Sequence, residues 1–303
     1  MGFISSAIDE ALMSVGNSMF EAGENMLKGG FEMWKSCSSV TMAYAVKSPM
    51  SQTNAWNTVT GNIYQISLAI GASLAVLFFV LGWLRESLDI KNSFQLENMF
   101  RFFIRYAITA SLLVNSLSLV KGITQCTTAV VNTMHVDVAS EEVEGIFDGI
   151  KEKLKEDKDS DGGTYLAAGF EAMAGGMIGG LVIIICGISL VLSVLSRLFK
   201  MLLCIPFAPV AFSGFAGGGE FSQMGVAWMK TFIGYALEAV VIALSISISF
   251  GLFRDASLFQ SPAEAGDMAS LILQICEYCM PMITACACVK GAEMTVRRCL
   301  GLG

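Results

Sequence analysis

The sequence is poor in charged residues and in the side chains that most often carry out catalysis. Asp, Glu, Lys and Arg make up 15% of the chain, against about 25% in soluble domains. There is one histidine, and the sequence contains no P-loop, dinucleotide-binding fingerprint, nucleophile elbow or HExxH motif. Because acid–base machinery is so sparse, we predict that the protein is not an enzyme and needs no cofactor.

Proline and positive charge are scarce as well. The 5 prolines stand against 30 glycines, a balance typical of closely packed membrane helices. The formal net charge is −7, so the chain as a whole lacks the basic footprint of a nucleic-acid-binding protein. Acidic residues concentrate between Asp137 and Asp161. Cys276 and Cys279 have the spacing of a ligand pair, but no second pair or histidine completes a site, so we interpret them as packing residues.

Long apolar segments are what the chain has in abundance. Ile63–Leu84 carries no formal charge. At about 1.5 Å per residue it is long enough to cross a hydrocarbon core of roughly 30 Å. Further apolar segments lie at 102–120, 173–195, 201–216, 232–252 and 269–289. We predict an all-α fold, a polytopic transmembrane helical bundle with about five full spans, in which 201–216 is a re-entrant or broken helix.

The apolar segments divide the chain into four predicted parts. They are an N-terminal amphipathic extracytoplasmic head (1–62), the first two spans (63–120), an acidic extracytoplasmic loop (121–172) and a C-terminal membrane bundle with a cytoplasmic tail (173–303). In the head, apolar residues recur at helical spacing, which indicates one or two amphipathic helices interrupted at Gly29-Gly30. The middle of the acidic loop also has helical periodicity.

Lysine and arginine predict the orientation. If 201–216 does not cross the membrane, the basic residues that flank the spans fall on one side: Arg85, Lys91, Arg101, Arg197, Lys200, Lys230, Lys290, Arg297 and Arg298. That side is then the cytoplasm, with the N-terminus and the acidic loop outside and the C-terminus inside. If 201–216 did cross, the bias would weaken. We favour the broken helix, which is tolerated where protein or a water-filled cavity surrounds it.

Three charged residues lie within the predicted spans, where charge is costly and usually functional. Arg105 is one turn into the second span and can extend to the interface. Glu238 and Glu277 lie deeper, and each could pair with another helix, line an aqueous lumen or relay protons. We favour a pairing or lumen-facing role and predict that Glu238 faces other protein and not lipid.

The run AGGMIGG predicts close helix contact. It places Gly175 over Gly179 and Gly176 over Gly180, the pattern that lets two membrane helices approach closely. A flexible or kinked entry to the third span is the alternative interpretation.

The run PFAPVAFSGFAGGG is unlike a simple span. Pro206 and Pro209 free backbone carbonyls, and Gly217, Gly218 and Gly219 end the element abruptly. Broken helices of this kind mark substrate sites in transporters. The same features fit a membrane-embedded hairpin at a subunit interface.

The charged strip at 85–101, between the first two spans, is predicted to be a cytoplasmic elbow. Arg85, Asp89, Lys91, Phe94 and Arg101 mix charge with an apolar anchor. We expect this elbow to lie along the inner membrane face and to form a docking surface for cytoplasmic ATPases.

The acidic loop contains a weak calcium candidate. Asp157, Asp159 and Asp161 stand at positions 1, 3 and 5 of a calcium-binding loop. Position 12, which needs a bidentate Glu, is Ala168. We therefore favour a solvated acidic turn and expect no metal.

The stretch SLAVLFFVLGWLRESLDIKNSFQLENMFRFFIRYAI resembles the TrbL-like polytopic membrane subunit of type IV secretion systems, in its Gram-positive conjugation form. PFAPVAFSGFAGGG and KGAEMTVRRCLGLG are similar to that family too, and the resemblance covers roughly Trp56 to Gly303. It implies a homo-oligomeric ring in the bacterial cytoplasmic membrane, in contact with membrane lipid, that works with partner ATPases in passing DNA with its bound protein. The acidic net charge leaves direct contact with DNA open.

Two other classes of function stay open. A secondary transporter would be built from an inverted repeat with two broken segments in matching halves, and only 201–216 is an evident broken segment in the sequence. A holin or membrane-anchoring scaffold would carry no substrate.

Overall fold

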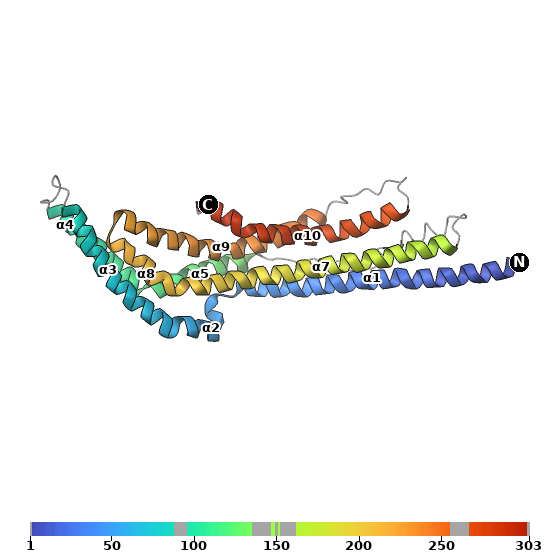
Figure 1. Ribbon diagram of the computed structural model, residues 1–303, viewed down its shortest axis with the longest axis horizontal. Coiled ribbons are helices and arrows are strands. Elements are labelled where there is room, and N and C mark those ends of the chain that lie inside the picture. The colour runs from blue at the N-terminus through green and yellow to red at the C-terminus, as the bar shows by residue number, and fades with distance from the viewer. Residues whose placement is uncertain are drawn as a thin grey trace. The chain divides into compact units, whose positions relative to one another are not determined.

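In a computed structural model of the chain, the structure describes residues 2–87, 96–134, 147–148, 151, 162–254 and 267–301. Within these residues every regular element is a helix, which confirms the predicted all-α fold (Figure 1). Three of the described helices are long and apolar enough to cross a membrane: Asn54–Arg85, Gly162–Ala216 and Gly219–Ser249. The total is up to four if one bent pair counts as a span, so this part of the chain is compatible with a membrane protein.

The chain divides into two compact units. Unit 1 comprises Met1–Met42, Val136–Leu192 and Leu244–Lys290, and unit 2 comprises Ala43–His135, Ser193–Ala243 and Gly291–Gly303. Four helices contribute residues to both units: α1 (Gly2–Val46), α7 (Gly162–Cys204), α9 (Gly219–Arg254) and α10 (Asp267–Cys299).

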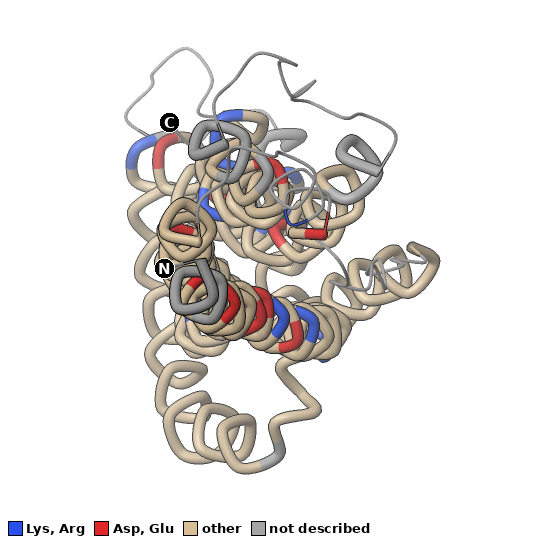
Figure 2. Tube along the Cα trace, turned by 90° about the vertical axis from the view of Figure 1, so that its right-hand side faces the viewer, with Lys and Arg blue, Asp and Glu red and all other residues tan. Residues whose placement is uncertain are grey.

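Helix α1 is continuous over its whole length. The predicted interruption at Gly29-Gly30 is therefore wrong. A glycine inside a helix costs only about 1 kcal/mol relative to alanine, which packing can offset. Here Gly30 lies directly against the backbone of Gly180 on α7, while Gly29 faces open space. Acidic and basic residues occur at several positions along α1 (Figure 2).

The buried face of α1 alternates small and large residues. A small residue returns every seventh position, at Gly16, Gly23, Gly30 and Cys37, and a larger one at Phe20, Leu27, Trp34 and Thr41. Together the buried positions follow the 3.5-residue period of a coiled coil. This period sets one continuous face of α1 against a neighbouring helix.

That neighbour is α7, and the two helices run parallel (Figure 1). Their glycines meet in register. A Cβ at Gly169 would lie 2.7 Å from the Gly16 oxygen, and one at Gly176 would lie 2.3 Å from the Gly23 oxygen. Real Cβ atoms do not approach a backbone so closely. The two backbones are therefore in direct contact, which only glycine permits.

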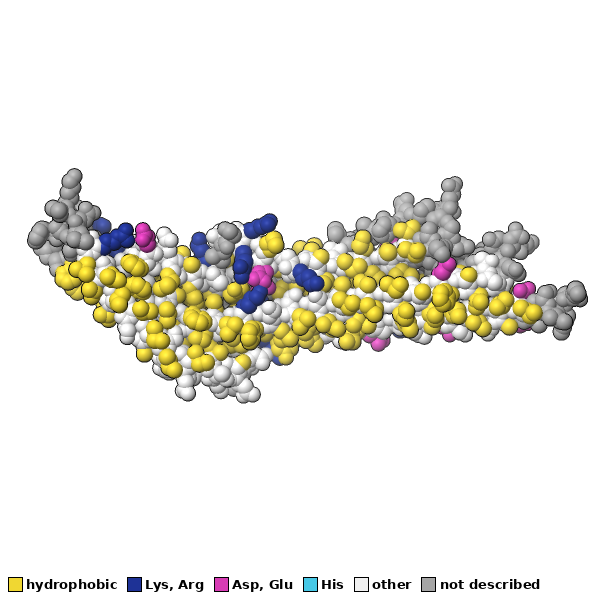
Figure 3. All heavy atoms as spheres, in the orientation of Figure 1, with side chains coloured by type: hydrophobic (Ala, Val, Ile, Leu, Met, Phe, Trp, Pro, Cys, Tyr) yellow, Lys and Arg dark blue, Asp and Glu magenta, His cyan; other side chains and the backbone are white. Residues whose placement is uncertain are grey.

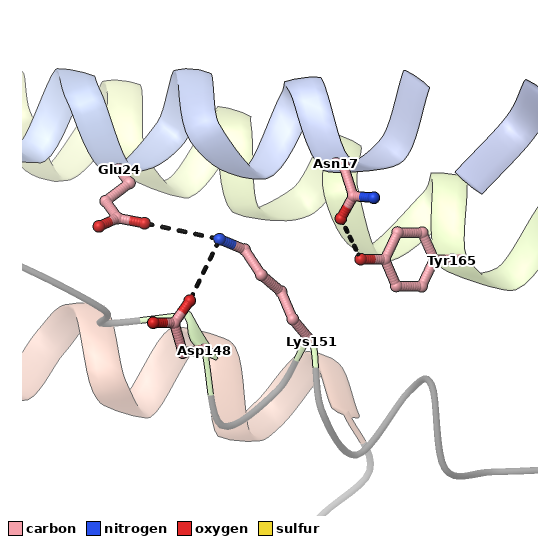
Figure 4. Close-up of polar contacts among 5 residues, drawn as sticks. All are labelled: Asn17, Glu24, Asp148, Lys151 and Tyr165. Atoms are coloured by element: carbon pink, nitrogen blue, oxygen red, sulfur yellow. Dashed lines mark hydrogen bonds and ion pairs between the residues drawn. The ribbon is translucent and has the colours of Figure 1, made fainter. Parts of the chain in front are cut away.

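An aromatic and polar group fixes the beginning of α7 on α1. The ring of Phe20 lies 5.6 Å from that of Tyr165 and 6.1 Å from that of Phe147, and Tyr165 donates a hydrogen bond to Asn17 Oδ1 (Figure 4). Lys151 reaches back to Glu24 on α1, with its Nζ 3.6 Å from the carboxylate.

Unit 2 is built from shorter helices around the beginning of α9. They are η1 (Pro49–Ser51), α2 (Thr53–Thr58), the π-helical turn η2 (Val59–Ile63), α3 (Tyr64–Ser87), α4 (Leu96–Val114), α5 (Ser116–Thr133), η3 (Ile205–Phe207), α8 (Ala208–Ser213) and η4 (Gly214–Ala216). Its core is an apolar cluster in which Phe212 stacks edge-on to Trp228 at 5.0 Å, and Trp228 lies flat on Phe232 at 5.2 Å.

The predicted second span, 102–120, is not one helix. Helices α4 and α5 meet at Asn115 with a bend of 66°. Asn115 Nδ2 donates to the Ser111 carbonyl, and the hydroxyls of Ser116 and Tyr64 are hydrogen-bonded at 2.6 Å. These polar side chains satisfy the backbone and hold the break, which is a recognised cause of a sharp kink without proline.

The predicted acidic loop is shorter than 121–172 at both ends. Helix α5 continues to Thr133, and α7 begins at Gly162. The sequence did not reveal these two helix ends because they are rich in Thr, Ser and Gly. Such residues are equally common in turns, so they give no clear helical pattern. The middle of the predicted loop lies outside the described residues, apart from residues 147–148 and 151.

Candidate functional site

The predicted broken segment forms three short helical pieces, η3, α8 and η4, that follow α7. Proline at 206 and 209 removes two backbone donors and disrupts the α-helical bonding. Other helices supply replacement donors. Trp228 Nε1 on α9 donates to the Cys204 carbonyl at 3.0 Å, and the Ser67 hydroxyl on α3 donates to the Pro206 carbonyl. The freed carbonyls are thus satisfied by side chains from distant parts of the sequence.

Protein surrounds most of this segment. Ala208, Phe212 and Ser213 are fully buried, while Phe207 points outward. Helix α3 packs on α8 so closely that a Cβ at Gly71 would lie 2.8 Å from the Pro209 carbonyl. The arrangement meets the physical condition for irregular backbone inside a membrane, which is enclosure by protein.

The glycines after the broken segment make a turn against which the Arg105 side chain of α4 packs. Gly218 and Gly219 have positive φ angles of 64° and 50°, a region that side chains rarely adopt. A Cβ at Gly218 would lie 2.1 Å from Arg105 Nη1, so the guanidinium rests on the glycine backbone. The structure therefore brings together two predicted features, the intramembrane Arg105 and the glycine run.

Glu238 lies in a cluster of charged side chains in unit 2. Its carboxylate interacts electrostatically with three cations, Arg197 and Lys200 on α7 and Arg297 on α10, and with Glu293. Glu293 forms one ion pair with Lys200 and a second with Arg297, whose Nη2 lies 3.0 Å from Glu293 Oε1. We call these five residues the charge cluster. It joins α7, α9 and α10 at one level.

Glu238 faces protein in the structure. It is 5% exposed and lines a small cavity of about 100 Å³ with Thr231, Tyr235, Glu293 and Arg297. Its Oε2 has no hydrogen-bond partner among the described residues. A polar cavity of this size has room for several water molecules, which are the usual partners of such buried groups.

Arg197 is the most deeply buried cation of the cluster. It is 3% exposed, and one of its terminal nitrogens donates to the Ala45 carbonyl at 3.4 Å. Burying a charge is unfavourable unless an opposite charge compensates it. Glu238 supplies a nearby negative charge, although among the described residues the two side chains form no direct ion pair.

The four predicted packing glycines face two different helices. Gly176 and Gly180 contact the backbone of α1, whereas Gly175 and Gly179 receive the side chain of Ile275 from α10. A Cβ at Gly175 would lie 2.5 Å from Ile275 Cδ1. In unit 1 the run AGGMIGG thus lets α7 pack closely on both neighbours, and the helix is not kinked there.

The remaining predicted residues are scattered. Glu277 is half-buried on α10 in unit 1. Arg85 forms an exposed ion pair with Glu220 at 3.7 Å, and Arg101 lines an open groove in unit 2. The other elbow residues, Asp89, Lys91 and Phe94, and the calcium candidates Asp157, Asp159 and Asp161 lie outside the described residues.

The sequence alone does not reveal the four charged residues that surround Glu238: Arg197, Lys200, Glu293 and Arg297. Two signals were available. Arg197 and Lys200 lie one turn apart just before the proline-broken segment, and Glu293 with Arg297 has the i,i+4 spacing of a helical ion pair. Neither signal reveals that the two pairs meet across helices. In the described residues no group of three or more His, Cys, Asp or Glu side chains could hold a metal ion.

The ion pairs of Glu293 predict a pH dependence of stability. Lys200, and then Arg297, hold the pKa of the Glu293 carboxyl below its ordinary value. A carboxyl whose pKa is lower in the folded than in the unfolded protein stabilises the fold at pH values above its unfolded-state pKa, about 4.3. This stabilisation is lost as the pH falls through the folded-state pKa. We expect a contribution on the order of 1 kcal/mol, because the pair is partly exposed. Thermal unfolding in mild detergent between neutral pH and acid would measure it.

In that experiment Glu293→Gln should lose stability at neutral pH and flatten the acid-side decline. Glu32→Gln, at an exposed position on α1, should leave both unchanged. An unaltered pH profile in Glu293→Gln would contradict the role of this carboxylate.

Every regular element in the described part of the chain is a helix, and its apolar helices are compatible with a membrane location. Comparison with protein-family models, with curated proteins and with solved structures finds no match to this chain.

Proposed function

We propose that the protein is a channel or scaffold subunit of a conjugative type IV secretion system, and that it forms part of the path for DNA and its bound protein across the cytoplasmic membrane. The secretion system is inferred from the sequence resemblance around the first two spans. A subunit role is supported by the structure of α7. We expect about five membrane crossings, with 201–216 enclosed in the bundle.

An outward-facing apolar stripe on α7 is the observation that carries the subunit role. Its members are Phe170, Met177, Ile178, Leu181, Ile185, Ile188, Leu192, Leu195, Phe199 and Leu203, all more than one-third exposed. From Phe170 to Leu203 the helix rises roughly 50 Å, whereas a hydrocarbon core is about 30 Å thick. Figure 3 shows apolar side chains over much of the visible face of α1 and α7. Lipid covers only part of such a stripe, and a second copy in a homo-oligomeric ring would cover the rest.

The parallel packing of α1 and α7 bears on the orientation of the N-terminus alone, because the end of α1, at Ala45, meets Arg197 at the other end of the third span. Parallel neighbours begin on the same side of a membrane, so the beginning of the head and the end of the acidic loop belong together. The lysine and arginine bias makes that side extracytoplasmic and places the C-terminus inside.

Photo-crosslinking in native membranes tests the subunit role. A photoreactive residue at Phe170 or Phe199, near opposite ends of the stripe, should give covalent oligomers of this chain. Ile183 is fully buried on the same helix and provides the matched control, which should give none. Mass measurement and imaging in mild detergent would then report the copy number. A strict monomer, with no crosslinks from either end, would overturn the proposal.

A secondary transporter is the second candidate, and one observation favours it. Transporter sites form between two broken helices, and the structure contains a second break, at Asn115, that the sequence did not reveal. Helices α4 and α5 both pack on α8, so the two broken segments are neighbours in unit 2. Uptake of a small solute by the purified monomer in vesicles would select this function over the first.

A further inference from the structure

Helix α1 carries a polar stripe on the side away from α7. Its members recur at alternating intervals of four and three residues: Ser14, Ser18, Glu21, Asn25, Lys28, Glu32, Lys35 and Ser39. All are exposed except Lys28, which is partly exposed. The residues that contact α7, such as Gly23 and Gly30, come two positions after members of the stripe. Two positions along a helix correspond to about 200° of rotation, so the stripe lies opposite the α7 contact.

Backbone contacts set the level of the stripe along α7. A Cβ at Gly23 would lie 2.5 Å from the Ala172 oxygen, and one at Gly187 would lie 3.2 Å from Cys37 Cβ. These contacts belong to unit 1, and the interval of α1 between them lies beside the matching interval of α7. Three charged members of the stripe fall in this interval: Lys28, Glu32 and Lys35.

The adjoining segment of α7 is uncharged. Glu171 and Arg197 border a run, Ala172–Ser196, that contains no Asp, Glu, Lys or Arg. The run rises roughly 36 Å, so a hydrocarbon core of about 30 Å can shift within it by only about 6 Å, or roughly four residues. If α7 crosses the membrane through this run, the core includes the level of those three charged residues in every position that it can take.

Charged side chains at this depth must face protein or water, because exposure to lipid is too costly. The buried centre of a protein interface is poor in charge and rich in aromatic side chains and Met. The stripe has neither kind of apolar residue, so water suits it better than a closely packed partner. Apolar residues form a separate flank of α1, where Met26, Met33 and Val40 are more than one-third exposed.

We propose that α1 crosses the membrane beside α7 and lines a water-filled path with its polar stripe. The inference rests on the proposed function, because in a homo-oligomeric ring each copy would add one such stripe to a shared path. Each charged member then becomes a ring of charge, as in many pores. The signs alternate along the path, with Glu21 and Glu32 negative and Lys28 and Lys35 positive.

The crossing changes the expected topology in one respect. With the N-terminus outside, α1 ends on the cytoplasmic side, where Ala45 accepts a hydrogen bond from Arg197. Helix α3 then crosses outward and places the elbow at 85–101 outside, which reverses the side predicted for it. The bent pair α4 and α5 enters and leaves the membrane on that outer side, so the number of crossings remains about five.

Cysteine labelling of the full-length protein in native membranes tests the inference. Glu32→Cys places a thiol in the stripe, and Met33→Cys places one at the same depth on the apolar flank. A membrane-impermeant cationic methanethiosulfonate should modify Glu32→Cys roughly tenfold faster, because it reacts with the thiolate, which forms in water and not in lipid. Peptide mass spectrometry would separate each new site from the nine native cysteines. Both thiols should react alike after unfolding in SDS.

Two results would overturn the inference. Equally fast modification of both thiols would show that α1 lies in bulk water, and protection of both would show that protein covers the stripe. Selective modification of Glu32→Cys, without crosslinks between copies from the apolar stripe of α7, would support a water-facing α1 and would overturn the proposed secretion subunit. The two proposals can therefore fail separately.

Discussion

Gly23→Ala is expected to destabilise the protein by about 1–3 kcal/mol, the usual effect of overpacking a tight contact. A Cβ at Gly23 would lie 2.5 Å from the Ala172 carbonyl oxygen, which belongs to the backbone of α7 and cannot rotate away. The reciprocal change, Gly176→Ala, meets the Gly23 oxygen at 2.3 Å and should cost at least as much. Either methyl group forces α1 and α7 apart and loosens the contacts on both sides of it.

Gly29→Ala supplies the control on the same helix. A Cβ at Gly29 has nothing within 4 Å, so this change should stabilise the protein by about 0.5–1 kcal/mol through helix propensity alone. The two substitutions are chemically identical and are expected to have opposite signs. Thermal unfolding in mild detergent, followed by circular dichroism, would compare them. Equal effects at the two positions would show that α1 and α7 do not touch at Gly23.

Glu238→Leu is expected to lower the free energy of unfolding by about 1–3 kcal/mol, because it removes the negative charge nearest to the buried Arg197. Arg197 is 3% exposed and depends on Glu238 for its nearby opposite charge. Arg197→Leu should be similarly damaging for the opposite reason. The double variant should recover part of the loss, since replacing two buried opposite charges together by apolar side chains leaves neither charge unopposed.

The cycle distinguishes pairing from other roles. Glu220→Gln, an exposed carboxylate on the same helix α9, should leave stability close to that of the wild type. If the double variant were no more stable than the worse single variant, the two residues would act independently. Full stability and normal assembly in Glu238→Leu would show that the charge cluster does not hold α7 to α9.

The class of fold could be predicted because it depends on local composition. The uncharged run Ile63–Leu84 requires an apolar environment whatever surrounds it. The bend at Asn115 could not be predicted, because no proline or glycine marks it. It depends on the Ser116 hydroxyl meeting Tyr64, a residue far away in the sequence. The continuity of α1 depends in the same way on Gly180, which offsets the cost of Gly30.

The candidate site was only partly predictable for a related reason. A carboxylate within an apolar segment is unusual enough for Glu238 to be recognised from the sequence. Its partners could not be recognised, because α7 and α10 bring them from opposite directions along the chain. The spacing of Gly175, Gly176, Gly179 and Gly180 predicts close contact. It does not reveal that one pair serves α1 and the other α10.

The register of α1 against α7 has a consequence for synthesis. Gly23 leaves the ribosome long before Gly176, its partner in the folded protein. At 5–20 residues per second, the roughly 150 intervening residues take on the order of 10–30 s to make. During that interval the glycine face of α1 has no partner within its own chain. The glycine face of a nascent α1 is therefore open to other chains and to chaperones until α7 has been made.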